Sequence, residues 1–315
     1  MILSNTELSS LPKITSYSVR DFIEMELPER KDLLQPWLPE QGLAMIHAPR
    51  GVGKTFFALS CAYAIGTGGE FLKFKAPEAK SVLYLDGEMP AAAIQQRLRQ
   101  LMPLDAADPL VNIITPDMQA REQGPINLGN PAYQEALKPY IEEASLIIVD
   151  NISTLVRGGK ENEAESWLPT QEWGLKLRSS GRSVLFIHHS GKDGRQRGTS
   201  RREDVLDTVI SLRQPGKYDP EQGAMFEIHF EKARGFTGAE AKPFEARLET
   251  DAQDRLVWTY KSIEDSTYLR VCKLANEGLE QREIAEELGI HKSNVSRHVS
   301  RGKGEGDIHS TDENV

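Results

Sequence analysis

The chain has 315 residues and a formal net charge of −9, and this length suits one large domain with one small domain. Hydrophobic residues make up 39% of it and charged residues 27%, as in ordinary soluble globular proteins, and no run of 18 apolar residues is present to cross a membrane. The acidic total argues against a protein that coats nucleic acid over its whole surface, although it allows local basic elements.

The cysteines and the first residues indicate a compartment. Cys61 and Cys272 lie far apart, in no metal-ligand or redox spacing. The stretch MILSNTELSSLPK lacks the basic flank and the apolar core of a signal peptide. We therefore expect a cytoplasmic protein with two buried thiols and no membrane contact.

Residues 1–35 are polar and mildly acidic, and we expect them to lead into a large domain over residues 36–262. In that domain apolar runs alternate with helical patterns. Strands are predicted at 43–47, 81–88, 111–115, 145–150 and 183–189, helices at 54–66, 90–101 and 131–144, and a broken helix at 165–181. This alternation predicts right-handed crossovers and an α/β fold, with a mainly parallel sheet covered by helices on both faces.

After residue 205 the helices stop and strands follow one another. These strands are predicted at 204–213, 224–233, 242–249 and 255–260. They would extend the sheet in antiparallel fashion at one edge. A linker is expected near Ser262, followed by a small all-α domain of three short helices at 266–303 and a disordered acidic tail at 304–315.

The stretch HAPRGVGKTF, residues 47–56, nearly matches the phosphate-binding loop pattern G-x-x-x-x-G-K-[ST]. In such a loop successive backbone N–H groups point into one cavity at a helix N-terminus, a lysine contacts the β- and γ-phosphates, and a hydroxyl ligates Mg²⁺. Alanine in place of the first glycine is tolerable where φ is negative, so we expect a working loop. The predicted nucleotide-binding residues are Ala48, Pro49, Arg50, Gly51, Val52, Gly53, Lys54, Thr55 and Phe56.

Two carboxylates complete the expected site. Asp150 ends the apolar run LIIVD, where it could hold Mg²⁺ together with Thr55. Glu88, in YLDGEMP, lies just past the carboxyl end of a strand, where ligands bind in open α/β sheets, and it could polarise the attacking water. Asp86 competes with it for that role. The expected cofactors are ATP and Mg²⁺.

Taken together, the strand-loop-helix segment, LDGEMP, LIIVDN and a strand ending in HH resemble the RecA-type ATPase fold. More narrowly, residues 36–260 resemble the hexameric helicases of the DnaB and RepA kind. The resemblance implies that Glu88 is the catalytic base. It also implies that a polar residue at the end of the strand after Asp150 senses the γ-phosphate. In this sequence that residue is His189 or His188.

The segment FEKARGFTG, residues 230–238, resembles the part of those helicases that reaches across a subunit interface. By that resemblance Lys232 and Arg234 would contact the γ-phosphate bound by the neighbouring subunit. Their spacing of two places both side chains on one face of a strand. The resemblance therefore implies a homo-oligomer with the form of a hexameric ring, whereas two basic residues at a simple hairpin turn are the alternative.

A basic, glycine-rich segment, residues 190–202, directly follows the sensor strand. In the resembled helicases this region faces the central channel and holds single-stranded DNA. With no aromatic residue in the segment, contact would be electrostatic, and a plain solvated loop is the alternative. The expected DNA contacts here are Lys192, Arg195, Arg197 and Arg201.

Residues 266–303 contain a helix, a turn at Gly278, a second helix at 281–288, a tight turn at Gly289, and a third helix. This pattern resembles the helix-turn-helix of resolvases and related regulators. A helical module that binds no DNA is the alternative. The expected DNA contacts in the last helix are Lys292, Ser293, Asn294, Ser296 and Arg297.

These features favour an ATP-driven, ring-forming DNA helicase or translocase of the RepA kind that serves replication of a plasmid, phage or mobile element. The main alternative is a DNA-bound regulator or replication initiator that ATP switches, because a helix-turn-helix is unusual for a motor on single strands. A RadA- or RecA-like recombination or repair ATPase is less favoured, since no partner-exchange or zinc-binding element is evident. A small-molecule kinase is disfavoured because no substrate lid is evident.

Overall fold

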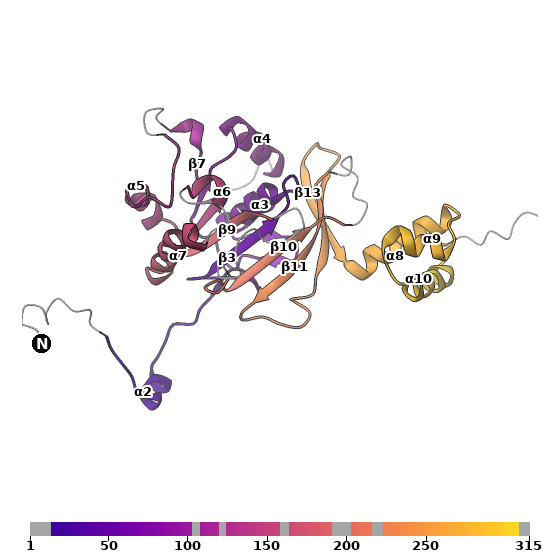
Figure 1. Cartoon of the computed structure of the whole chain (residues 1–315), viewed down its shortest axis with the longest axis horizontal. Coiled ribbons are helices and arrows are strands. Elements are labelled where there is room, and N and C mark those ends of the chain that lie inside the picture. The colour runs from indigo at the N-terminus through magenta and orange to yellow at the C-terminus, as the bar shows by residue number, and fades with distance from the viewer. Residues whose placement is uncertain are drawn as a thin grey trace, which may run out of the picture. The chain divides into compact units, whose positions relative to one another are not determined.

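Figure 1 shows the computed structural model, which divides into two units, Met1–Arg30 and Lys31–Val315. The described residues are 14–102, 108–119, 124–157, 164–190, 203–215 and 223–308. Among the described residues of the first unit is one short helix, α2 (Val19–Glu24), whose side chains are all exposed. Its N-cap is Ser18, whose hydroxyl accepts a hydrogen bond from the backbone N–H of Asp21.

The second unit is built on a nine-stranded sheet with the order β13-β12-β11-β10-β3-β9-β8-β6-β7. The strands are β3 (Leu43–Ala48), β6 (Val82–Asp86), β7 (Val111–Ile114), β8 (Leu146–Asp150), β9 (Ser183–His189), β10 (Thr208–Arg213), β11 (Met225–Ala233), β12 (Phe244–Thr250) and β13 (Leu256–Ser262). Pairing is parallel from β10 to β7 and antiparallel from β10 to β13. The expected mainly parallel α/β sheet with an antiparallel edge is therefore confirmed.

Strand β10 corrects one detail of that expectation, because it pairs in parallel with β3 rather than opening an antiparallel series. A parallel pair requires the chain to return to the same end of the sheet, and the segment between β9 and β10 provides this return. The antiparallel series begins one strand later, where β11 pairs with β10.

Helices cover both faces of the sheet (Figure 1). The helices of this domain are α3 (Lys54–Thr67), α4 (Ala91–Leu101), α5 (Pro131–Glu142), α6 (Ile152–Leu155), α7 (Ala164–Ser179) and the 3₁₀ turn η1 (Pro116–Met118). Alternate strand residues serve the two cores: Ile46 belongs to the core that includes residues of α3 and α4, whereas Met45 belongs to the core that includes residues of α5, α6 and α7. Burial on both faces explains the continuous apolar strands of the sequence.

Some elements differ from the sequence-based expectations. Helix α7 continues through Pro169, where a break was expected, because Trp167 and Trp173 anchor it in the core on either side of the proline. Two small hairpins and α6 were not expected. The hairpin strands are β1 (Asp32–Leu34) with β2 (Leu38–Pro39), and β4 (Glu70–Phe71) with β5 (Phe74–Lys75). Leu33 and Leu34, within the expected lead-in, are buried in the core.

Three helices form the C-terminal end: α8 (Ile263–Asn276), α9 (Gln281–Leu288) and α10 (Lys292–Glu305). The expected linker near Ser262 is wrong, because Ser262 ends β13 and its hydroxyl caps α8 by accepting from the backbone N–H of Asp265 at 3.0 Å. The expected disordered tail also begins too early, since α10 extends to Glu305 and Ile308 is buried against the three helices. None of the helices described here is both long and apolar enough to cross a bilayer.

Candidate nucleotide site

The loop between β3 and α3 has the backbone geometry that its glycines permit. Gly51 and Gly53 have φ values of 80° and 116°, which side chains with a Cβ rarely adopt, and a Cβ on Gly53 would lie 3.1 Å from the Cβ of Ala224. Ala48, in contrast, is the buried last residue of β3. An extended position needs no glycine, so the departure from the motif leaves the loop's path unchanged.

Lys54 is the first residue of α3, and its ammonium group lies over the loop. It donates to the backbone oxygens of Ala48, at 2.9 Å, and Pro49, at 2.7 Å. Burial lowers the pKa of Lys54 to about 8, while the charges of Asp150 and Glu88 oppose this change. An arriving phosphate would supply the negative charge that the buried ammonium lacks.

Two carboxylates meet at the carboxyl ends of neighbouring strands, where Asp86 of β6 is in register with Asp150 of β8. Asp150 accepts hydrogen bonds from the Tyr84 hydroxyl, at 2.6 Å, and from the Thr55 hydroxyl. Burial raises the pKa of Asp150, and it raises that of Asp86 to about 7. The Asp86 Oδ1 atom is buried and accepts no hydrogen bond from the described residues.

These oxygens fit a Mg²⁺ ion, which prefers carboxylate and hydroxyl ligands and takes its remaining ligands from water and nucleotide phosphates. Thr55 and Asp150 would hold the ion directly or through water, and the buried, unsatisfied oxygen of Asp86 would gain a partner beside it. No group of three or more His, Cys, Asp or Glu side chains with metal-site geometry occurs among the residues described, so phosphate ligands are needed as well. When bound, the ion would neutralise charge on the phosphates.

Glu88 is held by a residue that the sequence reasoning left without a role. The Asn151 side-chain amide donates to Glu88 Oε2 at 2.6 Å, and its nitrogen lies 3.3 Å from His189 Nε2. His189 Nε2 is also 3.5 Å from Glu88 Oε2. Burial and the nearby Lys54 lower the pKa of His189, so its ring is neutral at physiological pH. The Glu88 side chain is 52% exposed, which leaves its carboxylate accessible to a water molecule.

Of the two histidines proposed as sensors, only one reaches this site. His189 lines the cavity, and along β9 it shares a face with Leu185 and Ile187, which pack toward α3. His188 is the intervening residue, so it lies on the opposite face of the sheet, where it is buried. The assignment of His188 to the nucleotide site is therefore wrong.

The cavity beside the loop has a volume of about 530 Å³, and it is lined by Lys54, Thr55, Asp86, Glu88, Asp150, Asn151 and His189 among others. Arg97 of α4 also lines it, with its guanidinium 4.6 Å from the centre of the Phe56 ring. No sequence pattern pointed to Arg97, because the contact depends on how α4 packs beside α3. Tyr84 was missed because its hydroxyl acts from the middle of a strand.

Lys232 and Arg234 lie elsewhere in the chain and are absent from the described lining of this cavity. The Lys232 ammonium donates to the backbone oxygens of Glu203 and Asp204, and the Arg234 guanidinium donates to that of Asp204 at 3.3 Å. Both cations are thus directed to one turn, as a shared role requires.

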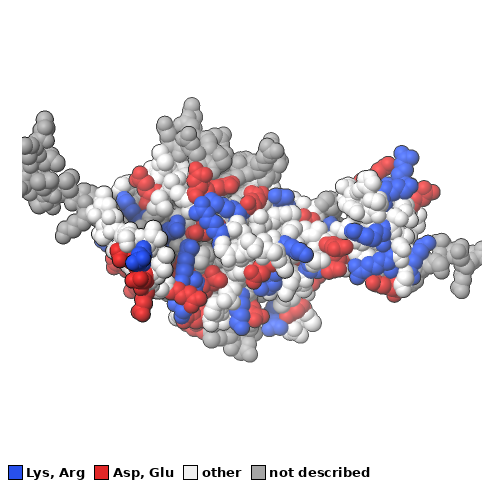
Figure 2. Space-filling view, turned by 90° about the horizontal axis from the view of Figure 1, so that it is seen from below, with Lys and Arg blue, Asp and Glu red and all other residues white. Residues whose placement is uncertain are grey.

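The residues expected to contact DNA fall into two groups. Lys192, Arg195, Arg197 and Arg201 lie outside the described residues. The α10 residues expected to contact DNA are all exposed, namely Lys292, Ser293, Asn294, Ser296 and Arg297. Between them Val295, His298 and Val299 are buried, so α10 presents one polar face, and Figure 2 shows Lys and Arg gathered on the C-terminal helices.

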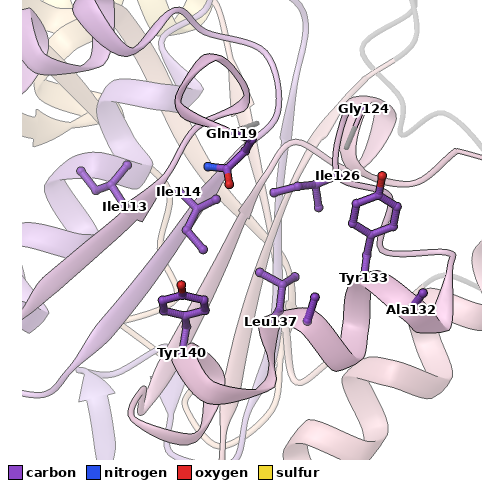
Figure 3. A pocket seen from close by; sticks show the side chains of 10 residues that line it. Ile113, Ile114, Gln119, Gly124, Ile126, Ala132, Tyr133, Leu137 and Tyr140 are labelled. Carbon is purple, nitrogen blue, oxygen red and sulfur yellow. The ribbon is translucent and has the colours of Figure 1, made fainter. Parts of the chain in front are cut away.

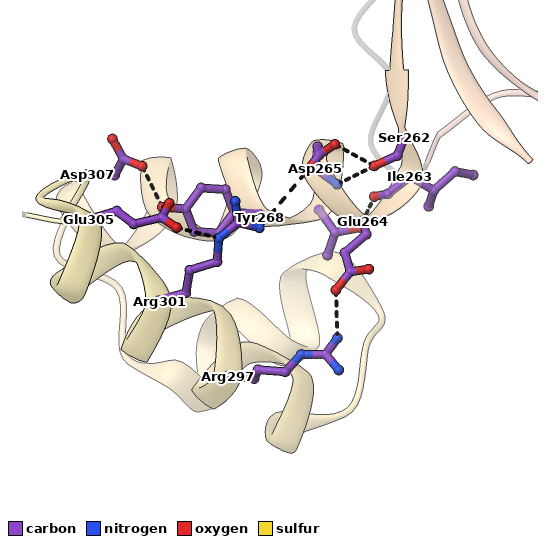
Figure 4. A network of polar contacts seen from close by, with 10 residues as sticks. Ser262, Ile263, Glu264, Asp265, Tyr268, Arg297, Arg301, Glu305 and Asp307 are labelled. Carbon is purple, nitrogen blue, oxygen red and sulfur yellow. Dashed lines mark hydrogen bonds and ion pairs between the residues drawn. The ribbon is translucent and has the colours of Figure 1, made fainter.

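Acidic side chains of α8 and of α10 itself partly neutralise that polar face (Figure 4). Arg297 forms an ion pair with Glu264 at 3.6 Å. Arg301 lies over the Tyr268 ring at 4.1 Å and bonds Glu305 at 3.0 Å. Lys292 and Asn294, at the start of α10, are exposed and lie outside these pairings.

A second cavity, of about 660 Å³, lies between β7 and α5. Figure 3 shows its lining, in which Ile114, Ile126 and Leu137 form an apolar floor and the two tyrosines, Tyr133 and Tyr140, stand at the sides. Its described lining carries no charged side chain. The described residues around it therefore include none of the charged groups that bind a nucleoside triphosphate.

A phosphate loop, two carboxylates at strand ends and a mainly parallel sheet define a RecA-type P-loop ATPase. The chain belongs to a family of AAA domains, which matches residues 8–195.

Two solved structures are similar to this chain. A KaiC-like protein from the hyperthermophilic archaeon Pyrococcus horikoshii has a TM-score of 0.51 and 14% identity, over 72% of this chain and 93% of that one. The flagellar accessory protein FlaH from Methanocaldococcus jannaschii has a TM-score of 0.47 and 13% identity, over 71% and 90% of the two chains. At such identity the first likeness shows the fold alone.

Proposed function

We propose that this ATPase is a DNA-binding homo-oligomer, a ring-forming helicase or translocase of the RepA kind that serves replication of a plasmid, phage or mobile element. One observation carries the proposal. Glu88, Asp150 and Lys54 gather in one cavity, whereas Lys232 and Arg234 point together at a turn outside it. A site completed by cations of a neighbouring subunit requires an oligomer, and a closed ring gives every site such a neighbour.

In this proposal the residues of one cavity divide the work of hydrolysis. Lys54 leaves the carbonyls of Ala48 and Pro49 and binds the β- and γ-phosphates. Glu88, oriented by Asn151, accepts a proton from the attacking water. Neutral His189 lies beside that carboxylate, where it can contact the γ-phosphate.

The neighbouring subunit supplies the last groups. Lys232 and Arg234 stabilise the negative charge that develops on the phosphoryl oxygens, as arginine fingers do in other phosphoryl-transfer enzymes. A single subunit would consequently bind ATP and hydrolyse it slowly.

The C-terminal helices support the DNA-binding part of the proposal. Helices α9 and α10 are joined by a turn at Gly289 with φ of 61°, and α8 closes their shared core, which supports a helix-turn-helix. The residues at the start of α10 would then contact base edges and phosphates. This arrangement also favours a second candidate, an ATP-switched regulator or replication initiator, because a helix-turn-helix docks on duplex DNA.

Steady-state ATP hydrolysis, measured alone and with single-stranded or duplex DNA, separates these candidates. Strong stimulation by single strands supports the motor. Slow hydrolysis that single-stranded DNA does not stimulate, together with tight duplex binding, supports the ATP-switched regulator. Lys292→Ala combined with Asn294→Ala should weaken duplex binding and spare ATP hydrolysis, and unchanged duplex affinity at moderate salt would contradict the helix-turn-helix role.

Mixing of variants tests the shared site. Arg234→Ala should bind ATP yet hydrolyse it poorly, and Glu88→Gln should be inactive by itself. In mixed oligomers an intact Glu88 meets an intact Arg234, so activity should return. A mixture that stays inactive would rule out a site shared between subunits.

A further inference from the structure

A chain of buried hydrogen bonds lies at the carboxyl end of β3, outside the nucleotide cavity. His47 Nε2 is 2.9 Å from Glu231 Oε2, and His47 Nδ1 is 2.9 Å from Ser190 Oγ. The ionised carboxylate can only accept, so Nε2 donates to it, and Nδ1 shares the second hydrogen bond with the Ser190 hydroxyl. His47 is 0% exposed and Ser190 is 5% exposed. Polar groups buried this deeply are costly unless paired, and here Ser190 and Glu231 supply the partners of His47.

An irregularity in the sheet directs Glu231 to this place. Val209 pairs with Lys232 and Ile210 pairs with Phe230, so Glu231 is the extra residue of a β-bulge in β11. Its carboxylate reaches past β10 to His47 on β3, and Arg213 of β10 donates to its other oxygen at 3.0 Å. The hydrogen bond from His47, and then Arg213, lower the pKa of Glu231 to about 2, so the carboxylate stays charged.

Each end of this series of hydrogen bonds lies next to a lysine to which the proposed function assigns phosphate binding. At one end, the Ala48 carbonyl oxygen accepts from the Ser190 backbone N–H at 2.9 Å and from the Lys54 ammonium at 2.9 Å. At the other end, Glu231 directly precedes Lys232 in β11. His47 lies between the lysine that binds a subunit's own nucleotide and the lysine proposed to act on the neighbour's.

We propose that His47 is a positioning residue that couples nucleotide binding in one subunit to the placement of Lys232, and hence to hydrolysis in the next subunit. The inference rests on the proposed function, in which Lys232 acts across an interface. When a phosphate draws Lys54 away from the Ala48 carbonyl, the strand end and Ser190 shift. His47 transmits the shift to Glu231 and to the bulge that aims Lys232.

The variant His47→Leu tests this coupling, because leucine fills a similar volume and makes neither hydrogen bond. Binding of a fluorescent ATP analogue should stay within about twofold of the unmodified protein, since the phosphate loop keeps its own contacts. The kcat should fall between about tenfold and about 100-fold, as expected when a charged group is displaced by an ångström. In mixtures with Glu88→Gln the activity should return, because each intact Glu88 then meets a correctly placed Lys232.

Two further variants guard against a simple folding defect. Glu231→Ala removes the same contact from a side chain that is 32% exposed, so it should reproduce both the loss of kcat and the recovery in mixtures. His229→Leu is the matched control: His229 pairs with Glu227 at 2.9 Å on the same strand, away from Ser190 and Ala48. It should leave kcat within about twofold.

The outcomes distinguish failure of the coupling from failure of the proposed function. If Arg234→Ala recovers in mixtures with Glu88→Gln but His47→Leu and Glu231→Ala do not, the shared site stands and the coupling through His47 is wrong. If none of the mixtures recovers, the shared site itself is wrong. A kcat for Glu231→Ala equal to that of the unmodified protein would also overturn the coupling.

Discussion

Replacing Asn151 by alanine tests the proposed orientation of Glu88. The Asn151 amide is 1% exposed and donates to Glu88 Oε2 at 2.6 Å. A hydrogen bond to a charged group contributes about 1.5–3 kcal/mol. At about 1.36 kcal/mol for each tenfold change in rate, full loss of this bond in the transition state lowers kcat about 10- to 150-fold. The affinity for ATP should change little, because the Asn151 side chain contacts Glu88 and His189 rather than the phosphate loop.

Single-turnover hydrolysis measures the rate, and equilibrium binding of an ATP analogue measures the affinity. Asn151→Asp should be slower than Asn151→Ala, because it cannot donate and places a second negative charge beside Glu88. Asn127→Ala is the control, since that amide donates to the Arg157 backbone oxygen at 2.9 Å, outside the cavity. Unchanged turnover in Asn151→Ala, or a loss confined to ATP affinity, would refute the role of Asn151 in orienting Glu88.

Three other changes have expected outcomes. Lys54→Ala should abolish ATP hydrolysis in a coupled phosphate-release assay, because the phosphates lose their buried cation. Arg270→Ala should lower the free energy of urea unfolding by about 2 kcal/mol, less than for a fully buried pair, because Lys261 still neutralises the buried Glu245. Burial lowers the pKa of His298 from its ordinary value of 6.5. The neutral ring therefore contributes its full share to the free energy of unfolding above pH 6.5, and this share is lost as pH falls through the lowered pKa. Hydrogen exchange of α10, corrected for intrinsic rates, should therefore be faster at pH 5.5 than at 7.5, and His298→Leu should remove the difference.

The parts of the site that the sequence predicts are those marked by short, contiguous residue patterns. The phosphate loop is a contiguous motif, and Asp150 and Glu88 follow buried strands whose carboxyl ends meet at one edge of a parallel sheet. The partners of those carboxylates were missed, because Asn151 and Tyr84 acquire their roles only from the alignment of β6 with β8. The start of α8 did have a signal: Ser262 and Asp265 have the spacing of an N-cap and its third helical residue.

The two adjacent histidines show why the remaining details depend on strand register. Both His188 and His189 follow the same apolar run, and successive side chains on a strand point to opposite faces, so a shift of one residue would exchange their roles. The pairing of Ala48 with His189 fixes the register, because it sets His189 beside the end of β3 on the face that carries α3. His47, one residue earlier, necessarily faces the other way, toward Ser190 and Glu231. The alternation that places His189 in the nucleotide cavity therefore also separates that cavity from the His47 hydrogen bonds proposed to couple neighbouring sites.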